Sequence, residues 1–184
     1  MKTIEEYIRE HESRFLEEWF SLLRIPSVSS DPARKAEMAA CAERWRTLLL
    51  EAGADEVRVM PSAGNPLVYA EKRVSPEAPT VLVYGHYDVM PADPLELWAS
   101  EPFEPEVRDG KVYARGADDD KGQCMIQLKA FEYMVRSGEL RHNVKFILEG
   151  EEEIGSPSLS AFLQEHKDLL ACDIVLVSDT SMLA

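Results

Sequence analysis

Apolar residues recur every three or four positions in four parts of the chain, a spacing that predicts four helices. Thr3 followed by Glu6 forms a capping-box pattern, so the first helix is expected to begin there and to end near Leu23. Asp31-Pro32 offers an N-cap and a first-turn proline for the second helix, which is expected to stop near Gly53. The expected helices cover residues 4–23, 32–53, 121–135 and 159–166.

Short apolar runs bounded by turn residues predict strands between these helices. Val81-Leu82-Val83-Tyr84 is a continuous apolar run, typical of a central strand that is covered on both faces. Asp109-Gly110 lies between alternating residues, so residues 106–113 are expected to form a hairpin. The other expected strands cover residues 56–60, 67–71, 144–148 and 174–177.

The order of these elements indicates the fold class. The chain opens with helices and then mixes strands with helices and one hairpin, which predicts an α/β fold, a three-layer sandwich with a mixed sheet. With 184 residues, of which 45% are hydrophobic, one globular domain is expected. Neither GxGxxG nor GxxxxGK[ST] follows any expected strand, which argues against a nucleotide-binding unit.

Net charge and cysteine content limit the partners and the cellular location that are expected. The formal net charge of −14, from 20 basic and 34 acidic residues, would repel nucleic acid and anionic membranes, so neither is expected as a partner. Cys41, Cys124 and Cys172 lie far apart, which suggests neither a disulfide framework nor a thiolate zinc site. Without a signal-peptide pattern or a run of about 18 apolar residues, a cytoplasmic location is expected.

Four polar stretches follow apolar runs and are the candidates for chemistry. They are Gly85-His86-Tyr87-Asp88, Asp118-Asp119-Asp120, Glu151-Glu152-Glu153 and Ser178-Asp179. In an open α/β sheet, ligands gather outside the carboxyl ends of the strands, so these stretches are expected to converge. Taken singly, each has an ordinary interpretation: a hydrogen-bonded strand-end histidine, a solvated loop or N-cap, an exposed acidic face, and a strand-end acid.

The combination favours a carboxylate-rich metal site. Imidazole and carboxylate are the ligands that hard or borderline cations use at catalytic sites. Two such ions about 3.5–4 Å apart need one carboxylate that bridges them. A hydrolase also needs a proton-transfer group, and the glutamate run offers a spare acid beside a ligand acid.

The same stretches carry a family resemblance. Residues 84–88, 116–122 and 149–156, together with Ser178-Asp179, resemble the di-zinc exopeptidase family of carnosine-type dipeptidases, aminoacylases and succinyl-diaminopimelate desuccinylase. Residues 98–103 and 108–111 resemble the dipeptidase branch in particular. The resemblance extends over essentially the whole chain and implies a mixed, mainly parallel sheet.

The resemblance also implies a ligand set for two divalent ions. His86 and Asp179 would bind the first ion, Asp119 would bridge the two ions, and Glu153 would bind the second. Zinc is the favoured metal, and manganese or cobalt would also suit these ligands.

Two further residues take roles in the proton transfers that the resemblance implies. Asp88 would orient His86, and Glu152 would act as general base and then general acid. The acidic runs leave Asp118 or Asp120 and Glu151 as alternative registers. The sequences Lys121-Gly122 and Gly155-Ser156 favour Asp119 and Glu152.

The resemblance therefore implies metal-dependent hydrolysis of an amide bond in dipeptides or short peptides. An N-acyl amino acid deacylase of the same family and a catalytically inactive metal- or partner-binding module are the alternatives. The family's late metal-ligand histidine and its inserted lid and dimerisation domain are not found in the 184 residues. Residues 1–184 are thus expected to be the N-terminal part of a catalytic domain, inactive alone, with the intact protein a homodimer through the missing domain.

Overall fold

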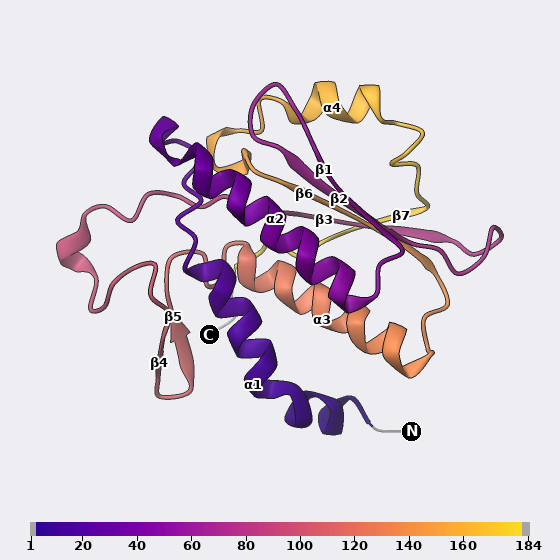
Figure 1. Cartoon of the computed structure of the whole chain (residues 1–184), viewed down its shortest axis with the longest axis horizontal. Helices are drawn as coiled ribbons and strands as arrows, with labels where there is room; N and C mark the ends of the chain where they lie inside the picture. Colours follow the sequence, from indigo (N-terminus) through magenta and orange to yellow (C-terminus); the bar gives the residue numbers. More distant parts are fainter. Residues whose placement is uncertain (1–2, 182–184) are drawn as a thin grey trace.

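A mixed five-stranded sheet organises the computed structural model, which describes residues 3–181 (Figure 1). Its strands are β1 (Glu56–Met60), β2 (Leu67–Lys72), β3 (Thr80–His86), β6 (Asn143–Glu149) and β7 (Ile174–Val177). The spatial order is β1-β2-β6-β3-β7, and β3 pairs in parallel with both β6 and β7. Only β2 runs against the other four, because it is antiparallel to β1 and to β6. The predicted mixed, mainly parallel sheet is therefore confirmed.

The helices also lie where the apolar spacing predicts them. They are α1 (Ile4–Leu23), α2 (Lys35–Ala52), α3 (Lys121–Ser137) and α4 (Leu159–Glu165), with short 3₁₀ helices η1 (Pro32–Arg34), η2 (Leu95–Leu97) and η3 (Glu152–Ile154). The predicted hairpin is present as β4 (Glu106–Arg108) and β5 (Lys111–Tyr113). No helix within residues 3–181 combines the length and the apolar character needed to cross a membrane.

The helix ends follow their capping residues. Thr3 and Glu6 form the predicted capping box at the start of α1. Glycine in the left-handed region ends α2 at Gly53 (φ 105°) and α3 at Gly138 (φ 72°). The predicted second helix begins with a separate 3₁₀ turn, because Arg34 leaves helical geometry with ψ at 16° and the α-helix proper starts at the next residue.

Helices cover both faces of the sheet. Along the buried strand β6, Phe146 faces a core shared with Trp45 of α2 and Phe131 of α3. The next residue, Ile147, faces the opposite core, which includes Phe162 of α4. Figure 1 shows α2 and α3 running alongside each other over one face, with α4 apart from them. The three-layer sandwich expected from the sequence is therefore present.

The edge strand β7 is much less covered than β6. Its four apolar side chains, from Ile174 to Val177, are between 40% and 58% exposed. Hydrogen bonding to β3 along one side positions this strand, so the residues that follow it need further contacts to be held in place.

A buried carboxylate joins α1 to α3. The Glu132 side chain is 1% exposed and accepts hydrogen bonds from the Tyr7 hydroxyl at 2.9 Å, Arg14 at 2.6 Å, Lys129 at 2.8 Å and Arg136 at 2.9 Å. Burial raises the pKa of Glu132, but the hydrogen bonds from Arg14 and Lys129 and the positive charges lower it to about 2. The carboxylate is therefore charged and fully partnered inside the fold.

Replacing Glu132 by alanine should destabilise the protein by about 3–5 kcal/mol, because Arg14 and Lys129 lose a buried counter-charge. Urea unfolding at neutral pH measures this change. Glu43→Ala, at an exposed glutamate paired with Arg46 on α2, should cost less than about 1 kcal/mol. Equal effects in the two variants would contradict the structural role of Glu132.

The contribution of Glu132 should also depend on pH. Its pKa of about 2 in the folded protein lies below the ordinary value of 4.5. Such a carboxyl stabilises the fold fully above its ordinary pKa and loses this contribution as the pH falls through the folded pKa. The difference in unfolding free energy between wild type and Glu132→Gln should hold at neutral pH and shrink between about pH 4.5 and 2. A difference that stays constant over this range would be inconsistent with the lowered pKa.

Candidate metal centre

Three strands of the sheet end at one edge and bring three of the four predicted polar stretches together, and the loop before α3 adds the fourth. In the parallel register, His86 at the end of β3 lies opposite Glu149 at the end of β6. Tyr84 of β3 lies opposite Val177 at the end of β7. Because parallel strands share their carboxyl edge, the loops after β3, β6 and β7 meet there.

Three of the predicted ligands form one group. His86, Asp119 and Asp179 each offer a donor atom, and these atoms all lie within 4.8 Å of one another. His86 Nε2 lies 3.1 Å from Asp119 Oδ1 and 3.7 Å from Asp179 Oδ2. The histidine is buried, whereas the carboxylate side chains are 60% and 30% exposed. The group is therefore buried at His86 and open to solvent at Asp119 and Asp179.

Asp88 lies on the other side of the His86 ring. His86 Nδ1 is 3.1 Å from the Asp88 backbone oxygen and 3.4 Å from Asp88 Oδ1. An Nδ1–H that donates to Asp88 leaves the Nε2 lone pair facing Asp119 and Asp179, as a metal ligand requires. The Asp88 carboxylate also accepts the backbone N–H groups of Glu152 and Glu153, at 3.2 and 3.1 Å. Asp88 therefore links the end of β3 to η3.

The two predicted glutamates differ in their placement. Glu152 Oε2 lies 4.0 Å from His86 Nε2, beside the group of three, and its side chain is 37% exposed. Glu153 lies outside that group, and its carboxylate accepts the N–H of Met90 at 3.2 Å. Burial and the negative charge of Asp119 raise the pKa of Glu153. Glu152 is thus placed at the rim of the group, and Glu153 lies on the same 3₁₀ turn with a different partner.

The acids around His86 favour a positive charge at its Nε2, which either a proton or a metal ion in place of that proton would supply. Burial lowers the pKa of this imidazole, but its hydrogen bond to Asp88 and the negative charges of Asp88, Asp120 and Asp119 raise it to about 10. One Asp120 oxygen, Oδ1, is buried without a hydrogen-bond partner among the described residues. A buried imidazole among several carboxylates suits a divalent cation, so the residues fit the metal that the resemblance implies.

The sequence predicts Asp120 only as an alternative to Asp119 and does not predict its contacts. Asp120 is fully buried, and its Oδ2 accepts the His86 backbone N–H at 3.1 Å and the Cys124 thiol at 3.0 Å. Burial raises the pKa of Asp120 to about 6. The four-residue spacing of Asp120 and Cys124 at the start of α3 is the signal that would have paired them.

Gln123 holds the segment that carries Asp179, a contact that no pattern in the sequence indicates. Its Nε2 donates to the Thr180 backbone oxygen at 3.0 Å, and its Oε1 accepts the Thr180 N–H at 3.1 Å. These two hydrogen bonds fix the backbone next to Asp179, directly after the exposed strand β7.

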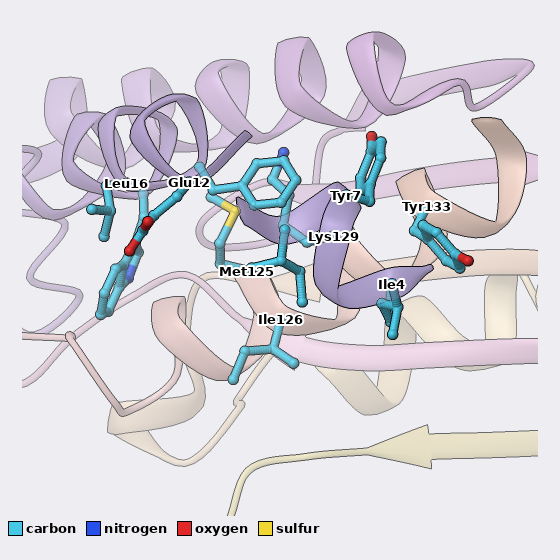
Figure 2. A pocket seen from close by; sticks show the side chains of 12 residues that line it. Ile4, Tyr7, Glu12, Leu16, Met125, Ile126, Lys129 and Tyr133 are labelled. Atoms are coloured by element: carbon cyan, nitrogen blue, oxygen red, sulfur yellow. The ribbon is translucent and has the colours of Figure 1, made fainter. Parts of the chain in front are cut away.

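A separate apolar groove lies between α1 and α3 (Figure 2). Its volume is about 330 Å³, and Figure 2 shows side chains of both helices around it, among them Tyr7, Leu16, Met125 and Ile126. None of the predicted site residues lines this groove. The groove is therefore separate from the predicted site residues at the strand ends.

Comparisons with known proteins identify the family of this chain. Residues 82–184, more than half of the chain, match the family described as peptidase family M20/M25/M40. The Beta-Ala-His dipeptidase of Rattus norvegicus is 33% identical over 197 residues, covering 97% of this chain and 39% of the rat protein.

Solved structures with the same fold lead to the same family. Human carnosine dipeptidase 1 matches with a TM-score of 0.86 at 31% identity, covering 95% of this chain and 40% of the human chain. An M20 family metallo-carboxypeptidase from Sulfolobus solfataricus matches with a TM-score of 0.84 at 32% identity, covering 92% of this chain and 38% of that one. The chain thus spans about two fifths of the length of these relatives.

Zinc should bind the group of three and stabilise the fold. A Zn²⁺ concentration about 100 times the Kd should raise the Tm by about 5–10 °C, because the ion binds only the folded state. Asp119→Asn should abolish this shift, since it removes a charged donor from the group. Asp118→Asn, one residue earlier and outside the group, is the matched control and should keep the shift. The reverse result would show that the assigned register is wrong.

Proposed function

This chain belongs to peptidase family M20/M25/M40, and we propose that its strand-end site serves metal-dependent hydrolysis of the amide bond in dipeptides or other short peptides. The observation that carries the proposal is the meeting of His86, Asp119 and Asp179, with Glu152 beside them. These side chains come from separate loops, and only the fold brings them together.

Two divalent ions are proposed as cofactors. His86 and Asp179 would hold the first, Asp119 would bridge the pair, and Glu153 would hold the second. Zinc is the favoured metal, with manganese and cobalt as alternatives that the same donors accept. When bound, such ions lower the pKa of a water molecule toward neutrality and polarise the substrate carbonyl.

Glu152 is the proposed proton-transfer group. Its carboxylate would take a proton from the attacking water as the water oxygen bonds to the amide carbon. The same carboxyl would return the proton to the amide nitrogen as the C–N bond breaks. Its position supports this role, because Glu152 Oε2 lies 4.0 Å from His86 Nε2 and its backbone is fixed by Asp88.

The names of the relatives support the substrate class. The rat relative is a Beta-Ala-His dipeptidase, and the human structure is a carnosine dipeptidase. The structure from Sulfolobus solfataricus is a metallo-carboxypeptidase. All three act on peptides, so we propose a peptide substrate for the natural protein that contains these residues.

Glu152→Gln should separate chemistry from metal binding. Because glutamine cannot accept the proton, kcat for dipeptide hydrolysis should fall by about 10²–10⁴-fold, whereas Zn²⁺ affinity should stay unchanged. Zn²⁺ affinity is measured on this chain, which the resemblance implies is inactive alone, and kcat is measured on the natural protein that contains it, with a dipeptide panel and N-acyl amino acids.

Glu165→Gln, an exposed change at the end of α4, is the control and should leave kcat unaltered. Hydrolysis that survives Glu152→Gln would refute the assigned base. Cleavage of N-acyl amino acids in preference to dipeptides would replace the peptidase by a deacylase. Zinc binding without hydrolysis of either substrate class in the natural protein would instead indicate a binding module.

A further inference from the structure

A fully buried carboxylate connects the two elements that carry His86 and Asp119. Asp120 Oδ2 accepts the backbone N–H of His86, at the end of β3, at 3.1 Å. Asp120 itself directly follows Asp119, in the loop that leads into α3. The Asp120 side chain therefore connects the backbone of His86 to the loop that carries Asp119.

Cys124 closes this contact from the first turn of α3. Its thiol lies 3.0 Å from Asp120 Oδ2 and is buried with it. The carboxylate thus receives donors from both β3 and α3. Because Asp120 Oδ2 accepts a hydrogen bond from each of these two elements, both set its position.

Gly85 allows this close approach. A Cβ atom added at Gly85 would lie 2.2 Å from Cys124 Sγ and 2.7 Å from Asp120 Oδ2. Any larger residue would push the carboxylate and the thiol away from β3. The contact between Asp120, Cys124 and β3 therefore requires glycine at position 85.

The cost of burying Asp120 suggests that the contact has a use beyond packing. Its second oxygen, Oδ1, is buried without a hydrogen-bond partner among residues 3–181. An incompletely partnered buried carboxylate is destabilising, and an apolar residue of the same shape would avoid this cost. An apolar residue, however, would supply neither an acceptor for the His86 N–H nor a negative charge beside the metal centre.

We propose that Asp120 is a positioning residue of the metal centre, which fixes the imidazole of His86 relative to the carboxylate of Asp119. This inference rests on the proposed function, because it takes these two residues as metal ligands. Asp120 acts through its hydrogen bond to the His86 backbone and needs no contact with the substrate. Its effect should therefore appear in metal affinity before it appears in turnover.

The test compares Zn²⁺ affinity, measured by competition with a chromophoric chelator, in the wild-type chain and in variants at this junction. Asp120→Leu keeps the branched shape but removes the acceptor, and it should weaken Zn²⁺ binding about 10–100-fold. Asp120→Asn keeps an amide oxygen that can accept the His86 N–H, so it should weaken binding by less than about 10-fold. This partial rescue is the signature of positioning by a hydrogen bond.

Asn143→Ala is the matched control for a loss of stability. Asn143 is also a buried polar side chain, and it holds the backbone of Val74 and Ser75 at the opposite end of β6. Its removal should lower the Tm but leave Zn²⁺ affinity within about twofold, since it lies far from the strand ends that form the site. Gly85→Ala, which displaces Asp120 without replacing it, gives a second route if Asp120→Leu does not fold.

The outcomes separate the two proposals. Weakened Zn²⁺ binding in Asp120→Leu or Gly85→Ala, with normal affinity in Asn143→Ala, supports the positioning role. Tight binding in the wild type that is unchanged in folded Asp120→Leu overturns this role and leaves the proposed function standing. Equal losses in Asp120→Leu and Asn143→Ala also overturn it, because they show a general effect of stability. A wild-type chain that binds no Zn²⁺ overturns both proposals.

Discussion

The parallel pairing of β3 with both β6 and β7 is the constraint on which the site depends. It places three strand ends side by side, with His86 at the end of the central one. The cores on the two faces of the sheet keep β3 and β6 in place. The loops that follow the strands, with the loop before α3, then bring several acids close together. The site is thus a consequence of strand order and register more than of any single motif.

Two charge clusters in the fold differ in the sign of the charges that surround the buried group. Glu132 is surrounded by arginine and lysine side chains of α1 and α3, so its pKa falls to about 2 and the cluster is balanced internally. At the strand ends, His86 is surrounded by acids and its pKa rises to about 10, while burial raises the pKa of Asp120 to about 6. The first cluster needs no ligand, whereas the second favours an added cation.

Much of this architecture could be predicted from the sequence, for physical reasons that differ between its parts. Helices and strands were predictable because apolar spacing and turn residues such as Gly53 and Asp109-Gly110 act locally. The meeting of His86 and Asp179 was predictable because strand ends converge, and Asp119 joins them from the loop that leads into α3. The contacts of Asp120 and Gln123 were not, since they depend on the path of loops between elements. The metal-binding roles of His86, Asp119, Asp179 and Glu153 stay predictions, as does the proton-transfer role of Glu152.

The most direct test of a metal centre at these strand ends is anomalous X-ray diffraction at the zinc absorption edge, from crystals of the chain grown with Zn²⁺. An anomalous peak is expected between His86 Nε2 and the carboxylates of Asp119 and Asp179, within coordination distance of all three. An ion bound elsewhere on the protein, with the His86 ring free of metal, would contradict it.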